Sequence, residues 1–280
     1  MMKMLSRGKF SLFLTFFCAL TWNMGAQETL PMVKVSGGDF AMSGKIGTTV
    51  SAFSLGKTPV TQAQFQKVMG FNPSHFKGAT LPVENVSWYD AVIFCNKLSE
   101  LEELTPAYVL NGRTVTWNRQ ANGYRLPTEA EYEFAARGGT LTQKTLFPGS
   151  NAPDEVAWYK DNSKNTTHPV GTKKPNELGL SDMSGNVWEW CWDWYSETLA
   201  GGNDPAGPRL GSLRVLKGGS WETPVTYLNL NNRSNAFPWD QDASIGFRVA
   251  RWETPPVLPA PAKAPTTEPP SAKPAPAAHP

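Results

Sequence analysis

Three stretches of the chain combine apolar residues at helical spacing with a hydroxyl residue that can cap the first turn. In each, the side chain three positions after the cap can reach back to the backbone: Thr61 is followed by Gln64, Ser87 by Asp90 and Thr128 by Glu131. Such reciprocal pairs satisfy N–H groups that the first turn of a helix leaves without partners. The pattern therefore predicts three helices, with Asp90 the shortest of the three reaching side chains.

The neighbouring residues predict where these helices end and which faces they bury. The first is expected to end near Met69, because Gly70 after it is a typical helix terminator. The third is expected to end near Arg137. The second presents a stripe to the core that consists of Ala91, Phe94, Cys95 and Leu98. The acidic start of the third helix, with Glu129, Glu131 and Glu133, suits the helix dipole, which explains these carboxylates without a catalytic role.

Outside the helices the pattern is less regular. Residues 31–53 alternate loosely between apolar and polar and contain Gly37 and Gly38, which suggests a β-hairpin that opens the domain. Residues 146–170 are polar with few apolar anchors, so they are expected to form a surface loop. With 40% hydrophobic residues, the chain can bury one sizeable core. We therefore predict one α+β domain over residues 27–252.

Residues 1–26 are typical of an export signal peptide. A basic start is followed by an almost continuous apolar run that is too short for a convincing membrane span. Cys18 leaves lipid attachment open as an alternative, although Phe17 directly before it suits that processing poorly. We expect the protein in the periplasm, on the cell surface or secreted, with the membrane reached only through such an anchor.

Residues 253–280 are rich in proline and alanine and carry few large apolar side chains. They cannot bury enough surface to offset the entropy of ordering, so we expect a disordered, extended tail. The formal net charge of the whole chain is +2, which gives no electrostatic reason to expect nucleic acid as a partner.

The most unusual stretch is residues 179–190, which reads G-L-S-D-M-S-G-N-V-W-E-W. Trp188 and Trp190 are two positions apart, so an extended backbone places both on one face, where they can bury a large apolar area. Asp182 and Glu189 bring carboxylates into this apolar setting, where they need donors or a cation. The stretch predicts a looped core segment whose oxygens converge on backbone N–H groups or on a hard cation such as calcium.

This stretch resembles the G-L-x-D-M-x-G-N-V-W-E-W signature of the formylglycine-generating enzyme family, the sulfatase-modifying factor domain. Three further blocks resemble the family in the same order: L-P-V-E-N-V-S-W-Y-D-A at residues 81–91, Y-R-L-P-T-E-A-E-Y-E-F-A-A-R-G-G at residues 124–139, and R-V-L-K-G-G-S-W at residues 214–221 continuing to G-F-R-V-A-R at residues 246–251. The resemblance implies a C-type-lectin-like fold with few regular elements and much irregular structure.

The resemblance also implies a structural calcium site. Its ligands would come from one carboxylate, two backbone carbonyls and the glutamate of W-E-W, which here are Asp182, Gly185, Val187 and Glu189. Mixed carboxylate and carbonyl oxygens suit a cation of high coordination number. The alternative is that the two carboxylates accept from backbone amides and no ion is present.

The family's chemistry depends on two cysteines five positions apart after G-G-S-[WY], which oxidise a substrate cysteine with copper bound between the thiols. Counted along this sequence, those two positions are Thr223 and Leu228. Neither side chain forms a thiolate, which both copper binding and thiol exchange require. Copper is therefore not expected. Cys95 and Cys191 have the surroundings of small core residues, and their spacing leaves a disulfide between them open.

Residues 221–244 alternate aromatic rings with short polar side chains, which is the composition of a recognition surface. An irregular loop with inward-pointing rings has the same composition. The candidate ligand-binding residues are Trp221, Tyr227, Asn229, Asn231, Arg233 and Trp239. The first hypothesis is an exported, non-catalytic module that binds a protein or glycan. The rival is an oxidoreductase related to formylglycine-generating enzyme, which would use Cys191 or a cofactor that the sequence does not reveal.

Overall fold

The computed structural model describes residues 30–255, so the predicted leader, Cys18 and residues 256–280 of the predicted tail lie outside the described residues. Within them, the four α-helices are α1 Gln62–Met69, α2 Trp88–Leu101, α3 Glu129–Ala136 and α4 Pro153–Val156. Two single 3-10 turns are η1 Gly139–Leu141 and η2 Val225–Tyr227. The remaining regular structure is twelve short strands. This is the α+β fold with much irregular structure that the sequence predicts.

The caps of the first three helices are those that the sequence predicts. Thr61, Ser87 and Thr128 each accept from the backbone three residues on, and each forms a complete capping box. The shorter Asp90 also reaches back, with its Oδ2 2.9 Å from the Ser87 backbone nitrogen. Gly70 ends α1 in the left-handed conformation at a φ of 86°. Local sequence is sufficient here because each cap satisfies backbone groups of its own helix.

The strands form four small sheets. A three-stranded antiparallel sheet has the order β1 Met32–Val35, β4 Phe53–Gly56 and β12 Ala250–Trp252. The four-stranded sheet has the order β10 Ser234–Ala236, β9 Arg214–Lys217, β7 Trp188–Trp194 and β11 Ile245–Gly246. The other two are β2 Gly38–Met42, β3 Ile46–Val50 and β8 Gly202–Asn203, and the hairpin β5 Tyr108–Asn111 with β6 Thr114–Trp117.

The opening hairpin exists, but its turn is not at the predicted glycines. Strands β2 and β3 pair antiparallel, and Ser43 and Gly44 make the turn at φ values of 49° and 74°. Gly37 and Gly38 instead lie where the chain passes from β1, in one sheet, to β2, in another. A glycine pair marks a change of chain direction, and only the pairing partners decide which change it makes.

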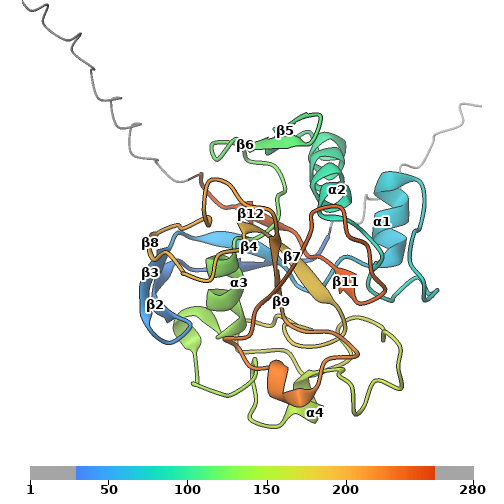
Figure 1. Cartoon of the computed structure of the whole chain (residues 1–280), viewed down its shortest axis with the longest axis vertical. Coiled ribbons are helices and arrows are strands. Elements are labelled where there is room, and N and C mark those ends of the chain that lie inside the picture. Colours follow the sequence, from blue (N-terminus) through green and yellow to red (C-terminus); the bar gives the residue numbers. More distant parts are fainter. Residues whose placement is uncertain (1–29, 256–280) are drawn as a thin grey trace, which may run out of the picture. The chain divides into compact units, whose positions relative to one another are not determined.

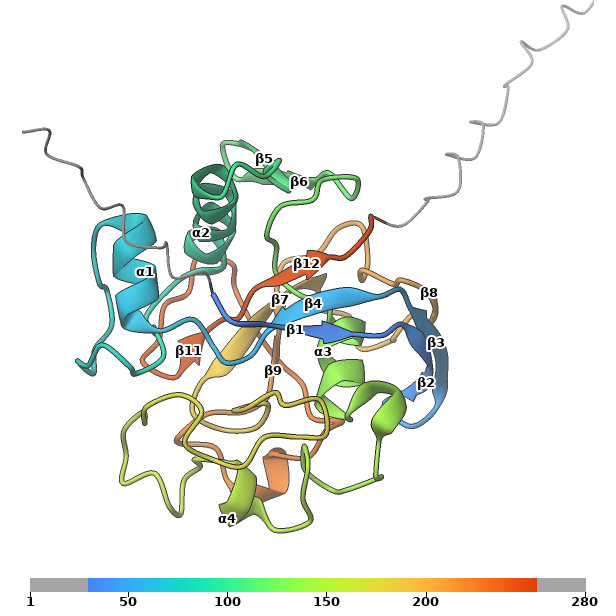
Figure 2. The ribbon, with the colours of Figure 1, turned by 180° about the vertical axis from the view of Figure 1, so that it is seen from behind.

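Within the unit that begins at Pro31, the helices lie around the sheets in separate places. Figures 1 and 2 show α1 beside α2, with the β5–β6 hairpin next to α2 and α4 at the opposite end. Helix α3 packs against β2, β3, β7 and β9, so it lies among three segments of the chain that are far apart in sequence. This places α3 and β7 at the centre of the described residues.

One buried apolar cluster of the core, the main cluster, includes Tyr132, Phe134, Ala135 and Ala136 of α3. A second cluster is smaller. The smaller cluster consists of Phe147, Val156, Ala157, Tyr159 and Leu228. Four of these five residues lie in the segment 146–170 that was predicted to be a surface loop, so that prediction is wrong in part. The apolar residues are too widely spaced to show a period, and they are buried because the chain after η2 covers them.

The first residue of the predicted tail belongs to the folded part. Glu253 forms an ion pair with Lys34 at 3.0 Å and accepts a hydrogen bond from the Ser54 hydroxyl. Within residues 30–255, none of the helices has the length and apolar character needed to cross a lipid bilayer.

Candidate ligand-binding site

Strand β7 carries alternating tryptophans and small or acidic residues. Trp190 is fully buried, and its Nε1 donates to the Val86 carbonyl at 3.0 Å. Cys191, the next residue, is also fully buried and packs in the main core cluster with Tyr132 of α3. Trp188 is only half-buried and lines a surface pocket. The predicted joint burial of Trp188 and Trp190 therefore holds for Trp190 alone.

The three glutamates of α3 are buried, and each forms an ion pair with at least one basic side chain. Glu129 holds Arg233, Glu131 holds Arg125, and Glu133 holds both Arg137 and Lys217. Sequence reasoning assigned these carboxylates to the cap and the helix dipole, and only Glu131 has a capping role, accepting from the Thr128 nitrogen at 2.8 Å. A buried carboxylate without a partner is costly, so α3, which is buried on all sides, requires these basic partners.

One of these pairs fixes the position of Arg233. Its Nε and Nη2 donate to the two oxygens of Glu129, both at 2.7 Å, and its Nη1 donates to the Ser196 carbonyl at 2.6 Å. Such a bidentate contact sets the plane of the guanidinium as well as its place. Arg233 lines two cavities, a smaller one of about 240 Å³ together with Glu129 and Asp193, and a more open one of about 400 Å³.

The larger of these two cavities is the candidate binding pocket. Its lining residues are Trp188, Glu222, Thr223, Pro224, Tyr227, Asn232, Arg233 and Ser234. Tyr227 and Arg233 were predicted as ligand-binding residues, and the structure brings them together here. Trp188, Glu222, Asn232 and Ser234 were not predicted. The sequence pointed to Trp188 only through its place two positions before Trp190. Whether the Trp188 ring is exposed depends on the strands that pair with β7.

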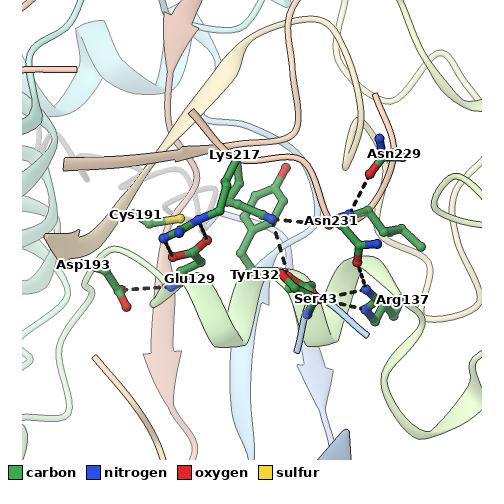
Figure 3. Close-up of polar contacts among 12 residues, drawn as sticks. Ser43, Glu129, Tyr132, Arg137, Cys191, Asp193, Lys217, Asn229 and Asn231 are labelled. Atoms are coloured by element: carbon green, nitrogen blue, oxygen red, sulfur yellow. Dashed lines mark hydrogen bonds and ion pairs between the residues drawn. The ribbon is translucent and has the colours of Figure 1, made fainter. Parts of the chain in front are cut away.

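The other predicted binding residues do not line this pocket. Trp221 is half-buried, and its Nε1 donates to the Ala243 carbonyl at 3.1 Å. Asn229 and Asn231 are exposed. The backbone nitrogen of Asn231 donates to Asn229 Oδ1, and Asn231 Oδ1 accepts from Arg137 (Figure 3). Trp239 is exposed and stacks on Phe237, with ring centroids 5.0 Å apart.

Thr223 and Leu228 have packing and hydrogen-bonding roles. Thr223 is 5% exposed, and its Oγ1 accepts from the Ser220 nitrogen at 2.9 Å. Leu228 is 1% exposed and belongs to the smaller core cluster. Gly219 lies against both, because a Cβ on it would meet Leu228 Cδ2 at 2.7 Å. Both positions thus support the loop that carries Tyr227.

Comparison with known proteins identifies the architecture. The model of the sulfatase-modifying factor enzyme 1-like domain matches residues 22–253. The chain belongs to the sulfatase-modifying factor family. It is 40% identical over 275 residues to the chaperone protein LppX of Paenibacillus barcinonensis, covering 84% of this chain and 93% of LppX.

Two further proteins are similar to this chain over much of its length. The formylglycine-generating enzyme of Streptomyces coelicolor is 35% identical over 187 residues, which are 60% of this chain and 52% of the enzyme. This chain therefore spans about half the length of that enzyme. Among solved structures, variable protein 1 of Treponema denticola has a TM-score of 0.74 at 36% identity, covering 79% of this chain and 94% of that one.

The two cysteines within residues 30–255 are removed from solvent. Cys95 and Cys191 are both fully buried and do not form a disulfide. Burial raises the pKa of the Cys191 thiol well above its ordinary value, and Asp193 beside it adds to the rise. A reactive cysteine needs access and a lowered pKa, so the structure does not supply what the rival hypothesis requires of Cys191.

Glu189, one of the predicted calcium ligands, lies against the guanidinium of Arg248. Both of its carboxylate oxygens accept from the Arg248 guanidinium, at 2.6 and 2.7 Å. The same guanidinium donates to the backbone carbonyl of Asp182 at 3.1 Å. Asp182 Oδ2 accepts from the Gly171 nitrogen at 2.6 Å, and Oδ1 is buried without a hydrogen-bond partner among the described residues. Of the predicted ligands, only Asp182 retains an unoccupied carboxylate oxygen.

These contacts do not fit a calcium ion held by the predicted set. An ion bound to Glu189 would lie beside a fully buried guanidinium, and like charges repel strongly where water is excluded. Gly185 has a different role, because a Cβ there would meet the Trp158 carbonyl oxygen at 2.2 Å, and its φ of 78° favours glycine. The Glu189 carboxylate and the Asp182 backbone carbonyl accept from the Arg248 guanidinium, whereas the Asp182 carboxylate accepts from the Gly171 backbone N–H.

Proposed function

We propose that this protein is an exported, non-catalytic member of the sulfatase-modifying factor family that binds a protein or glycan ligand through residues 221–239. The observation that carries the proposal is the packing of Thr223 and Leu228, the positions assigned by resemblance to the reactive cysteines. Both are buried and neither can form a thiolate. Thr223 lines the binding pocket, and no cysteine is among the residues that line it, so the pocket lacks the sulfur that the family's oxidation requires.

The exposed rings support a binding role. Tyr227 is 58% exposed, Phe237 43% and Trp239 53%, although large apolar side chains usually bury most of their surface. Phe237 and Trp239 stack at an interplanar angle of 7°, so each holds the other in place. Rigid aromatic rings beside adaptable polar groups lose little entropy on binding. We refer to Tyr227, Arg233, Phe237 and Trp239 as the binding face.

The relatives favour a protein partner over an enzymatic substrate. LppX, which this chain matches over nearly its whole length, is named a chaperone protein. The relatives also include formylglycine-generating enzymes, which are the basis of the oxidoreductase alternative. This chain spans only about half of the Streptomyces enzyme. Export is proposed from residues 1–26, with Cys18 as a site of lipid attachment if the leader is processed there.

The absence of catalysis is tested with the full chain and a Cys-x-Pro-x-Arg peptide in the presence of copper and oxygen. The Streptomyces formylglycine-generating enzyme is the positive control. No loss of the peptide thiol and no aldehyde product are expected from this protein. Aldehyde formation above the level seen without protein would contradict the proposal.

The binding role is tested by capture of proteins and glycans from the cell envelope of the source organism. A Tyr227→Ala/Trp239→Ala variant is compared with wild type and with Leu146→Ala, which removes an exposed apolar side chain outside the binding face. At least about a tenfold loss of the captured component is expected for the double variant alone, since such rings are typical hot spots. Equal capture by all three proteins would refute this assignment of the face.

A further inference from the structure

A second groove, separate from the binding pocket, lies between the β5–β6 hairpin and residues 206–210. It measures about 730 Å³, and Trp192 and Trp194 of β7 complete its wall. Its basic lining residues are Arg113, Arg119, Arg209 and Arg214. No aspartate or glutamate lines it, and none of the seven ion pairs within residues 30–255 includes these arginines. The groove therefore concentrates positive charge that the described residues do not neutralise by contact.

Two of these arginines are short of hydrogen-bond acceptors. Arg214 is only 3% exposed. Within the described part of the chain, its guanidinium makes one hydrogen bond, from Nη1 to the Trp192 carbonyl. Arg119 donates from Nη2 to the Asp204 backbone carbonyl at 3.0 Å. The Nε atoms of both are buried and unpartnered among residues 30–255. Buried donors normally have partners, so both guanidinium groups beside the groove keep hydrogen-bonding capacity that the described residues do not use.

The charges around Arg214 favour an anion. Burial lowers the pKa of Arg214 to about 9, and Asp193 opposes that shift without forming an ion pair. Burial also lowers the pKa of Arg119, which Asp204, Glu131 and Asp193 oppose. With a pKa of about 9, the Arg214 guanidinium remains protonated at neutral pH, and a bound anion would compensate its charge.

The aromatic rings hold the arginines and provide flat surfaces. The Arg214 guanidinium lies 3.4 Å from the centroid of Trp194, and that of Arg119 lies 5.0 Å from the centroid of Trp117. These cation–π contacts orient the donor forks without using their hydrogen bonds. Trp117, Trp192 and Trp194 are half-buried, so part of each ring remains available in the groove.

We propose that this groove binds an acidic saccharide, a short sugar chain that carries carboxylate or sulfate groups. Planar guanidinium forks match the geometry of carboxylate and sulfate oxygens. The tryptophan rings suit the apolar faces of sugar rings, and the exposed hydroxyls of Thr114 and Thr116 suit sugar hydroxyls. The volume is that of a small-ligand site. A long nucleic acid is disfavoured because the net charge of +2 provides no wider field to hold a polyanion.

The test is isothermal titration of the full chain with three disaccharides: digalacturonate, a sulfated disaccharide and uncharged cellobiose. Wild type is compared with Arg119→Gln/Arg209→Gln and with the matched control Lys67→Gln/Lys97→Gln, which removes the same charge from exposed positions outside the groove. Circular dichroism and thermal melting check that each variant is folded. Single Arg209→Gln, at a fully surface position, replaces the double variant if that one does not fold.

At least one anionic disaccharide is expected to bind with a Kd that rises at least about tenfold in the arginine variant and stays unchanged in the lysine variant. Binding is also expected to weaken at high salt and to quench tryptophan fluorescence. The two anionic arms show whether carboxylate or sulfate is preferred. The proposal would be overturned if cellobiose bound equally well, or if the arginine variant bound the anionic disaccharides as wild type does. It would also be overturned if a single-stranded oligonucleotide, titrated in the same way, bound more tightly than the disaccharides.

Discussion

At the scale of single residues, Arg248 is the cation around which the central loop is built. Its donors reach the carboxylate of Glu189 and the backbone carbonyls of Gly56, Ser181 and Asp182. These groups come from the end of β4, from the loop before β7 and from β7 itself. A fully buried ion pair stabilises a fold only when all its remaining donors are satisfied, as they are here.

Removal of one member of this pair is expected to leave an unpaired buried charge. Glu189→Gln should lower the free energy of unfolding by about 3–5 kcal/mol, because Arg248 would lose its counter-charge inside the core. Urea denaturation measures this change. The matched control is Glu100→Gln, which alters an exposed glutamate and should change stability by no more than about 0.5 kcal/mol. Equal losses in the two variants would contradict the role given to Glu189.

The same arrangement predicts how the protein responds to calcium. Because Arg248 already compensates Glu189, neither added calcium nor a chelator is expected to shift the Tm of the wild-type protein. Differential scanning calorimetry in millimolar calcium or excess EGTA measures this directly, with magnesium as the control ion. A rise in Tm that is specific to calcium would restore the ion site at Asp182, Gly185, Val187 and Glu189, since a ligand of the native state stabilises it.

Cys191 provides a third residue-scale prediction. Because it is fully buried and its pKa is raised, an aromatic disulfide reagent is expected to modify it only as fast as the protein unfolds. The measurement compares labelling of native protein with labelling in urea, followed by mass spectrometry to locate the site. Rapid modification of the native thiol would revive the oxidoreductase alternative.

At the scale of elements, α3 joins the binding face to the core. Its Glu129 holds Arg233, which lines the binding pocket and directly precedes β10. Its Glu133 holds Lys217 of β9. The helix is short and buried along its whole length, so its stability comes from these partners and from packing more than from propensity. A change at Glu129 therefore acts on the loop that carries Tyr227.

Glu129→Gln is expected to weaken the bidentate contact with Arg233 and to loosen the binding face. Hydrogen exchange of residues 225–236 should become at least about tenfold faster, while α1 and α2 keep wild-type protection. The exposed Glu197→Gln serves as the control, because it neutralises a nearby carboxylate that has no ion pair within residues 30–255. Unchanged exchange in Glu129→Gln would show that the loop is held by other contacts.

At the scale of the whole molecule, buried carboxylates determine how stability varies with pH. Burial raises the pKa of Asp193 well above its ordinary value, and Glu129 adds to the rise. The folded protein thus keeps this proton at pH values where the unfolded chain has lost it. The stabilisation is fully present below the ordinary pKa of an aspartate. It falls as the pH rises from that value to the raised pKa, and above the raised pKa it is absent.

Asp193→Asn should remove this dependence, because the amide keeps an oxygen that can accept from the Glu129 nitrogen, as Asp193 does at 2.9 Å. The variant is expected to be more stable than wild type at about pH 8 and to show a flatter profile between about pH 5 and 8. Denaturant midpoints across this range test it. The exposed Asp161→Asn should follow the wild-type profile, and an equal flattening in both variants would exclude Asp193 as the cause.

By itself, the sequence determined the three capped helices, the α+β class and the family. Caps and apolar stripes act within a few residues, so Thr61, Gly70 and Thr128 could be interpreted without knowing the rest of the fold. It also determined that positions 223 and 228 cannot supply thiolates, because that depends only on which side chains are present.

Only the tertiary structure decided which charges and rings meet. The partner of Glu189 lies 59 residues away and that of Glu129 lies 104 residues away, and no local pattern encodes such a distance. The same holds for Trp188, which β7 places in a pocket, and for the arginine-lined groove, which forms where the β5–β6 hairpin meets residues 206–210. A buried charge needs a counter-charge from any part of the chain, so the packing of distant segments, and not their spacing, chooses the pair.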